Sequence, residues 1–598
     1  MLPRVLLSWI LAVTSILLAA AAPWAVTVPL PCPGNNCTQA INAALASCAS
    51  YDSCTVSLQP GDYLLSGASA GQRIAVQGGL SNVVVQGAGQ GATRLLLDDV
   101  ATAIYIAGCS NMTFANFAID SVRLPFTYAR VASLGTTAGS PVGVVLEVNT
   151  TSGEYDFSPA AQARWPWLLQ AQGLLSFDPV NRRIPPGATD IYALPPHALP
   201  VVVSGSPSGG LVNISLPTVP QGTLRVGDAV ILRHVIYGST SLEAHRGSGF
   251  TVQNVSLRSG AGMGVYGSFQ RDISIAGLRI ERVNGRPMSI NADGVHFINC
   301  RGGPFSLRDS LLEGQGDDGL NVATTYVDIE DMGPSPDGSA TTLRLGRWGS
   351  ILPEGLLPLA ANDTLVFLHR SDMTEVGRAV VASVSNRNGN VTLTGRIPSG
   401  VALLDLAYSL QSEADSVAVQ RNTFTCNRAR GSLLKARNLV ASDNVYNFTS
   451  GPAAQAIPDG CDWFEGITLW NWTFANNSVR GGNWGGDAKP AMIYVASNAP
   501  IYVNGTPSDK ACVVPCPAQP LHVGVTVRGN TFTTGAASGG AFSVVSAEGV
   551  LVADNVVQYE ATGDMPSFDF NATAVLNASV SSNTCAGRPG GSCIVIGF

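Results

Sequence analysis

The sequence predicts an all-β protein: a right-handed parallel β-helix with two small inserted β-barrel modules and a short N-terminal helical cap. Strand-like runs such as "SVAVQRNTF" and "VLVADNVV" end repeatedly in an asparagine followed by a turn. Three steps between successive aligned asparagines measure 22, 25 and 28 residues, which is the length of one β-solenoid coil. A β-sandwich, the alternative for such a strand-rich chain, would not return the same turn residue so often. The aligned positions are Asn422, Asn444, Asn477, Asn530, Asn555 and Asn583.

Each further element has its own signal. The segment "CTQAINAALASC", residues 37–48, has helical apolar spacing between two cysteines, and we expect it to cover the first coil. Two stretches break the repeat and show hairpin-like runs with turn punctuation, which predicts modules inserted at loops of the solenoid. The predicted division is a leader over 1–22, the cap and first coils over 23–125, a barrel over 126–236, central coils over 237–325, a second barrel over 326–410 and C-terminal coils over 411–598.

The N-terminal segment has the pattern of a secretory signal peptide. Arg4 precedes the apolar run 5–18, and residues 19–22 are four alanines suited to cleavage. A signal anchor is the alternative, because the run approaches the length needed to span a bilayer. Thirteen Asn-X-Ser/Thr sequons, from Asn36 to Asn577, also favour a secreted glycoprotein, extracellular or in a cell wall.

Cysteine spacing and net charge narrow the compartment and the partners. In an oxidising compartment, close cysteine pairs predict local disulfides. The formal net charge of −7 gives no basic surface, so we expect no nucleic-acid partner. No later segment is long and apolar enough for stable membrane insertion, and the tied C-terminal end favours a monomer. The pairs are Cys32/Cys37, Cys48/Cys54, Cys512/Cys516 and Cys585/Cys593.

An acidic cluster is the strongest candidate for a functional site. Asp293 in "NADGVHF" and the pair Asp317 and Asp318 in "GQGDDGLNV" lie about one coil apart. If Asp293 and Asp317 occupy the same coil position, their backbones stack about 5 Å apart. Crowded carboxylates repel, which raises at least one pKa, and glycoside hydrolysis needs one protonated acid and one ionised carboxylate. A calcium site and ordinary turn residues remain as alternatives.

These two motifs resemble the signature of glycoside hydrolase family 110, whose members are α-galactosidases acting on α-1,3-linked galactose. Weaker pieces of the resemblance follow in the expected order between about 80 and 480. They are "FAIDSVRLPFTYARV", "VGDAVILRHVIYGS", "GAGMGVYGS", "CNRARGSLL" and "DWFEGITL". The resemblance implies the β-helix with two barrel insertions, an inverting hydrolysis of terminal α-linked galactose without a cofactor or metal, and a carbohydrate substrate.

The resemblance also implies site residues. The catalytic residues would be Asp293, Asp317 and Asp318, with Asp293 assigned as the acid and the other two as the base. Candidate substrate contacts at other positions are Glu465, Arg428, Arg430, His296, Tyr237 and His234. Related β-helix sequences often carry histidine where this chain has Ala323, which puts one substrate contact in doubt. Inverting enzymes usually hold their carboxyls about 6.5–9.5 Å apart, so the bend at residues 316–319 would have to widen the stacked spacing.

Two other functions compete with this one. A polygalacturonase-like hydrolase also uses one aspartate and then a pair one coil later, but its Gly-His-Gly and Arg-x-Lys motifs are absent downstream of Asp318. A polysaccharide lyase would need a basic proton abstractor, for which Lys435 is a weak candidate. The non-enzymatic alternative is a cell-surface β-helix that binds glycans without turnover, since the fold alone argues for no activity.

Overall fold

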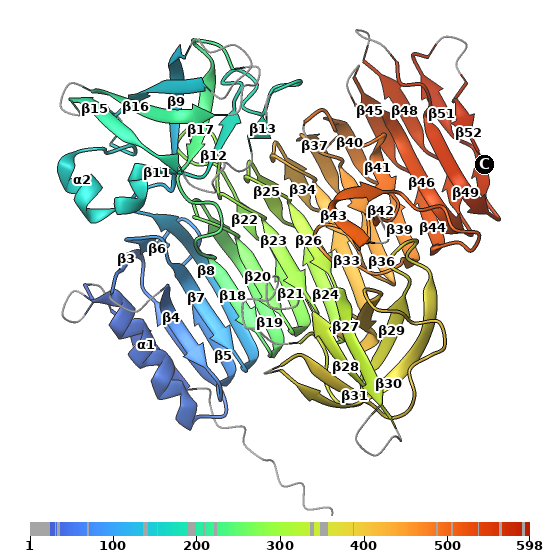
Figure 1. Ribbon diagram of the computed structural model, residues 1–598. Helices are drawn as coiled ribbons and strands as arrows, with labels where there is room; N and C mark the ends of the chain where they lie inside the picture. Colours follow the sequence, from blue (N-terminus) through green and yellow to red (C-terminus); the bar gives the residue numbers. More distant parts are fainter. Residues whose placement is uncertain are drawn as a thin grey trace, which may run out of the picture.

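Three columns of stacked parallel strands form the body of the protein, a right-handed parallel β-helix, as predicted (Figure 1). The computed structural model describes residues 24–29, 31–32, 36–67, 71–135, 142–151, 153–188, 190–191, 199–206, 210–219, 224–334, 340–346, 357–386, 388–485, 488–503, 506–535, 538–560, 565–588 and 592–597. The leader predicted over 1–22 lies outside these residues. Among the described helices, none has the length and apolar character to cross a membrane.

Each coil contributes one strand to each column, and two long strands, β8 and β19, pass from the first column into the second. The first column holds β1 (Trp24–Val28), β2 (Cys54–Leu58), β5 (Ser81–Gln86), β8 (Ser110–Ser121), β19 (Ser248–Leu257), β21 (Arg271–Ala276), β24 (Pro304–Arg308), β33 (Ser416–Gln420), β36 (Leu439–Ser442), β39 (Trp470–Ala475), β44 (His522–Arg528), β47 (Leu551–Ala553) and β50 (Ser579–Ser581). The second adds β3 (Gly61–Leu65), β6 (Thr93–Leu97), β22 (Arg279–Ile280), β25 (Leu311–Glu313), β34 (Thr423–Thr425), β37 (Val445–Thr449), β40 (Ser478–Gly482), β45 (Thr531–Thr534), β48 (Val556–Tyr559) and β51 (Thr584–Ala586).

The third column carries the candidate site. It holds β4 (Gln72–Gln77), β7 (Thr102–Ala107), β18 (Leu242–His245), β20 (Val265–Ser268), β23 (Val295–Ile298), β26 (Leu320–Ala323), β35 (Ser432–Leu434), β38 (Ala454–Ala456), β41 (Ala491–Val495), β46 (Gly540–Glu548), β49 (Phe570–Leu576) and β52 (Val595–Ile596). Inward side chains of all three columns form one continuous apolar core that runs from Val28 to Cys585. Stacked coils bury these side chains along the axis, which is how a solenoid obtains its stability.

The repeated asparagines form a ladder at one corner of the β-helix. The backbone N–H of Asn422 donates to Oδ1 of Asn444 at 2.9 Å, and Asn444 bonds Asn477 in the same way. The contact repeats through Asn530 and Asn555 to the last coil. Each of these amides is also tied to a carbonyl of a neighbouring coil, as Asn444 Nδ2 is to Val419 O. The recurring turn residue therefore joins coil to coil.

Helix α1 (Cys37–Ser47) covers the first coil, as expected of a cap. Asn36 begins the helix, because its side chain accepts a bond from the backbone N–H of Gln39. Ile41 and Leu45 pack into the same core as the first strands. In Figure 1 this helix lies at the blue end of the coils, and the chain ends at the opposite, red end.

The two insertions differ from each other. The second is a closed barrel, β27-β28-β31-β30-β29-β32, made of β27 (Val327–Pro334), β28 (Thr341–Gly346), β29 (Thr364–Leu368), β30 (Glu375–Ser385), β31 (Asn390–Leu393) and β32 (Leu406–Ser409). The first is a seven-stranded sheet in the order β13-β12-β17-β9-β10-β16-β15, made of β9 (Phe126–Leu134), β10 (Val142–Asn149), β12 (Gly173–Ser176), β13 (Asp190–Ile191), β15 (Val202–Ser206), β16 (Leu211–Val219) and β17 (Ala229–Arg233). Its two edge strands do not pair within the described residues, so the closed barrel predicted there is replaced by an open sheet.

Short elements complete the fold. Helix α2 (Pro159–Arg164) and the strand pair β11 (Gln170–Ala171) and β14 (Leu199–Pro200) accompany the first insertion, and the hairpin β42 (Ala499–Val503) and β43 (Thr506–Val513) follows β41. Among the described residues, 3₁₀ turns span Cys48–Ser50, Pro166–Leu169 and Leu410–Ser412.

One predicted disulfide is wrong. Cys512 bonds Cys461, which lies 51 residues away, and Cys516 is an exposed free cysteine. The β42–β43 hairpin brings Cys512 back to the loop that carries Cys461, a contact that sequence spacing does not reveal. The local pairs Cys32–Cys37, Cys48–Cys54 and Cys585–Cys593 are confirmed.

Candidate active site

The three aspartates lie in the turns that lead into two stacked strands, β23 and β26. The strand register pairs Val295 with Leu320, so Asp293 stacks on Asp318. The sequence spacing suggests Asp317 at that position, and the register places it one residue away. The backbone N–H of Asp318 donates to Asp293 Oδ1 at 3.2 Å. All three carboxyls are buried, and one oxygen of each lies within 4.8 Å of an oxygen of the other two.

The glycines beside these acids bring the coils close together. A Cβ at Gly294 would lie 2.5 Å from the carbonyl oxygen of Gly319, and one at Gly316 would lie 2.5 Å from that of Asn291. Side chains would push the turns apart, so glycine is required where backbone stacks on backbone. The bend at residues 316–319 therefore keeps the acids close and does not widen their spacing.

Cationic and hydroxyl donors hold Asp317 and Asp318. Arg428 Nη1 donates to Asp317 Oδ1 at 3.1 Å, and the Tyr237 hydroxyl donates to Asp317 Oδ2 at 2.8 Å. Arg430 binds Asp318 twice, through its backbone N–H at 2.8 Å and through Nη2 at 2.9 Å. Such charge-assisted bonds stabilise carboxylates and fix their orientation.

His296 joins Asp293 to a second acidic group. Its Nδ1 lies 2.8 Å from Asp293 Oδ2, and its Nε2 lies 3.9 Å from Glu465 Oε1. Glu465 Oε2 in turn accepts bonds from Lys435 Nζ at 2.5 Å and from Asn321 Nδ2 at 3.1 Å. The acids thus alternate with cations across the site.

Burial and charge set the protonation of this cluster. Burial raises the pKa of Asp293, and the charge of Asp317 raises it further, while His296 opposes both. Burial also raises the pKa of Asp318 well above its usual range, although the Arg430 guanidinium acts against it. Burial alone would raise the pKa of Glu465, but Lys435 and then His296 lower it to about 2. Burial alone would lower the pKa of His296, but the hydrogen bond to Asp293 and the charge of Asp293 outweigh burial, so the pKa of His296 is raised above its usual value.

A cavity of about 870 Å³ opens over these groups. The three aspartates line it together with predicted contacts Tyr237, His296, Arg430 and Glu465. Arg428 does not line it and reaches Asp317 from outside the cavity.

Another predicted substrate contact, His234, does not line the cavity. His234 is fully buried in the first insertion, with one ring nitrogen 2.8 Å from Thr127 Oγ1 and the other 2.7 Å from the carbonyl oxygen of Gln170. Burial lowers the pKa of His234 to about 3, so the ring is neutral. Its partners leave it no contact with a substrate. Ala323, where related chains often carry histidine, is buried and pairs with Ile298.

Within the described residues, the buried polar atoms His296 Nε2, Asn321 Oδ1 and Gln455 Oε1 belong to residues that line the cavity and have no hydrogen-bond partner. All three residues lie in one row across β23, β26, β35 and β38. Leaving a buried polar atom without a partner costs about 1–3 kcal/mol, so this row is suited to a polar ligand. Sequence reasoning missed Asn321, Gln455 and the pairing of Lys435 with Glu465, because only the coil register brings them together.

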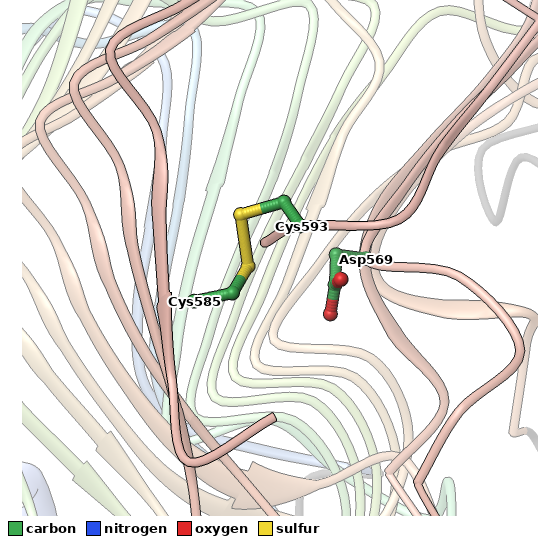
Figure 2. Close-up of side chains that lie close together, drawn as sticks. All are labelled: Asp569, Cys585 and Cys593. Atoms are coloured by element: carbon green, nitrogen blue, oxygen red, sulfur yellow. A yellow bond between two sulfur atoms is a disulfide. The ribbon is translucent and has the colours of Figure 1, made fainter. Parts of the chain in front are cut away.

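In the part of the chain that the structure describes, two clusters have the composition of a metal site. Figure 2 shows Asp569 beside Cys585 and Cys593, whose sulfur atoms form a disulfide and are therefore not thiolate ligands. The other cluster is the three aspartates. These carboxylates already contact Arg428, Arg430 and His296, so these side chains balance much of the negative charge without a metal ion.

Comparison with known proteins shows that the chain is similar to curated α-1,3-galactosidases. No family model matches the chain. An α-1,3-galactosidase B of Akkermansia muciniphila is 25% identical over 43% of this chain and 33% of its own length. An α-1,3-galactosidase B of Parabacteroides distasonis is 23% identical over 65% of this chain and 62% of its own length. An α-1,3-galactosidase A of Streptomyces avermitilis is 24% identical over 76% of this chain and 71% of its own length. In the first two, the chain spans less than two thirds of the relative.

Solved structures share the outline only. A family 28 exopolygalacturonase of Yersinia enterocolitica has a TM-score of 0.39 at 11% identity, covering 96% of this chain and 78% of that one. The mannuronan C-5 epimerase AlgE6 A-module of Azotobacter vinelandii has a TM-score of 0.34 at 12% identity, covering 91% and 94%. The fold assignment therefore rests on the strand pairing. On sequence, the predicted resemblance is confirmed: the chain is a homologue of curated α-1,3-galactosidases.

Proposed function

We propose that the protein is a secreted, inverting exo-α-galactosidase that removes terminal α-linked galactose from glycans. The observation that carries this proposal is the buried trio of Asp293, Asp317 and Asp318 at the wall of a cavity that also presents unpartnered polar atoms. The α-1,3-galactosidase homologues support galactose as the sugar. Inversion is inferred from the family resemblance alone, because one oxygen of each carboxyl lies within 4.8 Å of the others, which is closer than the spacing of about 6.5–9.5 Å usual in inverting enzymes and nearer to that of retaining ones.

Asp293 is the proposed general acid. Among the described residues it has no arginine partner, and its neighbour His296 is itself titratable. Its raised pKa keeps a proton available to the leaving oxygen at a pH where an ordinary aspartate is ionised. The proton passes to the glycosidic oxygen as the bond to the anomeric carbon breaks.

Asp317 and Asp318 are the proposed base. Each bonds a guanidinium that stabilises the carboxylate, and oxygens up to 4.8 Å apart can both accept bonds of about 2.8 Å from one water. That water attacks the anomeric carbon and loses its proton to the pair. The raised pKa of Asp318 opposes this role, so the pH–rate profiles of the Asp293→Asn and Asp318→Asn variants distinguish the two carboxyls.

Galactose hydroxyls provide what the row of unpartnered atoms lacks. His296 Nε2, Asn321 Oδ1 and Gln455 Oε1 each gain a partner from a bound sugar. The ionised Glu465 accepts bonds from hydroxyl donors beside Lys435. This set of buried polar groups that line the cavity is suited to binding one terminal sugar residue.

Secretion is supported by four disulfides, which persist in oxidising compartments. The signal-like leader and the sequons agree with it. N-terminal sequencing of the mature protein tests whether the leader is cleaved, and glycan analysis tests whether the sequons are glycosylated.

The decisive experiment incubates the protein with a panel of terminal α-galactosides and reads the first-released anomer by NMR. β-Galactose means inversion, α-galactose means retention, and no release from any glycan refutes the proposed function. Asp317→Asn should abolish release while it leaves folding and glycan affinity largely intact. Equal turnover by this variant and the wild type would refute the catalytic role of the trio.

A further inference from the structure

An exposed tryptophan stands at the wall of the cavity. Trp463 is 58% exposed, yet it lines the cavity together with Asp462 and Lys489. Single exposed apolar side chains are common on proteins and carry no meaning by themselves. Trp470, at 53% exposure, is such a case, since it lies on β39 and does not line the cavity.

The loop that presents Trp463 is held rigidly. Asp459 Oδ1 accepts the backbone N–H groups of Cys461 at 2.9 Å and Asp462 at 3.1 Å, and its Oδ2 accepts that of Trp463 at 3.1 Å. The disulfide from Cys461 to Cys512 ties the loop to the β42–β43 hairpin. A side chain on a fixed loop loses little further freedom on binding, which favours contact with a ligand.

Contacts from the second insertion secure the other side of this loop. Arg370, fully buried, donates from Nε to the carbonyl oxygen of Gly460 at 3.0 Å. Its guanidinium also lies 4.8 Å from the ring centre of Phe464, which is buried. Trp463 is thus exposed to solvent between two anchored neighbours, while Glu465, two residues later, is buried and lines the same cavity.

The cavity has room for more than one sugar. Its volume of about 870 Å³ is near the upper end of the range of about 300–1,000 Å³ found for ligand sites. We place galactose beside the buried charged and amide groups that line the cavity, and a glycan that carries it must extend from there towards solvent. Trp463 lines the same cavity and is largely exposed to solvent. Flat indole rings offer an apolar face to the C–H groups of a pyranose.

We propose that Trp463 is the stacking platform of a leaving-group subsite, on which the pyranose that carries the terminal galactose lies. Asp462 and Lys489 also line the cavity and can form hydrogen bonds with that sugar's hydroxyls. This inference rests on the proposed galactosidase function. It makes Trp463 a determinant of which glycan is cleaved, while the acids carry out the cleavage.

The test compares two substrates that differ only in the leaving group, an α-1,3-linked galactose disaccharide and α-galactosyl fluoride. Trp463→Ala should lower kcat/KM for the disaccharide about 2- to 12-fold more than for the fluoride, which is the range that aromatic stacking energies give. Trp463→Phe should retain most of the wild-type preference. Trp470→Ala, the matched control, should change neither substrate. Thermal melting confirms that each variant is folded.

The outcomes separate the two proposals. A wild-type protein that releases galactose from neither substrate refutes the proposed function. An active wild type whose Trp463→Ala variant loses the same factor on both substrates, or loses nothing on the disaccharide, refutes the subsite alone. As a readout independent of turnover, Asp317→Asn should show a change in tryptophan fluorescence on titration with the disaccharide, and the double variant Asp317→Asn/Trp463→Ala should lose that change and bind more weakly.

Discussion

Replacing Lys435 by methionine should destabilise the protein strongly, because it leaves a buried carboxylate without its main cation. Lys435 is 4% exposed and Glu465 8%, and their charged atoms are 2.5 Å apart. After the substitution, Asn321 still bonds the carboxylate, and the nearest remaining cation is His296 at 3.9 Å. Breaking a buried ion pair by removal of one partner costs about 3–5 kcal/mol.

The pKa of Glu465 gives a similar magnitude. The fall from 4.5 to about 2, at about 1.36 kcal/mol for each unit, corresponds to roughly 3 kcal/mol. Because this pKa is lower in the folded protein, the stabilisation is fully present above about pH 4.5 and is lost as the pH falls towards 2. The difference in the free energy of unfolding between wild type and Lys435→Met should therefore be about 3 kcal/mol at pH 7 and should shrink below pH 4.5.

Denaturant unfolding at pH 7 and pH 3 measures this difference, with Lys435→Met/Glu465→Gln as the matched control. In the double variant no charge is left unpaired, so it should be more stable than Lys435→Met alone. The reasoning fails if Lys435→Met unfolds like the wild type at pH 7, or if the double variant is no more stable than the single one.

Three further outcomes follow. Tyr237→Phe removes the donor to Asp317 and should lower kcat/KM about 10- to 100-fold, because hydrogen bonds to charged groups contribute about 1.5–3 kcal/mol; an unchanged steady-state rate would contradict the contact. Excess chelator should change neither the melting temperature nor galactose release, and loss of either would mean that the carboxylates hold a metal ion. Peptide mapping without reduction should recover Cys461 linked to Cys512, and a thiol reagent should label Cys516; a Cys512–Cys516 peptide would overturn this pairing.

The repeat in the sequence was sufficient to predict the β-helix, because each coil repeats the same local requirement: an apolar strand and then a turn that tolerates left-handed backbone. The same repeat predicts that Asp293 lies close to Asp317 and Asp318, because the two motifs are about one coil apart in the sequence. Their pairing was off by one residue, because Asp318 and not Asp317 stacks on Asp293. Exact register depends on the backbone of the turn, which spacing alone does not specify.

Contacts between distant coils and insertions could not be predicted. Lys435 and Glu465 are 30 residues apart, and only their coils' stacking shows that they form one pair. His234 follows a strand and resembled a site residue in sequence, but the open sheet of the first insertion buries it. Cys461 pairs across 51 residues because of a hairpin that no spacing rule indicates.

The asparagine ladder has a consequence for damage to the molecule. Asn477 gives its backbone N–H to Asn530 and receives that of Asn444, so each interior member serves two neighbours. Deamidation of Asn477 would replace its amide by a carboxylate, which cannot donate the hydrogen bond that Nδ2 now makes to the carbonyl oxygen of Ala441. Deamidation at Asn477 would therefore remove hydrogen bonds to the coils on both of its sides, because Nδ2 donates to Ala441 O and to Asn530 Oδ1. A chemical change in one side chain would thus loosen the contact between three successive coils.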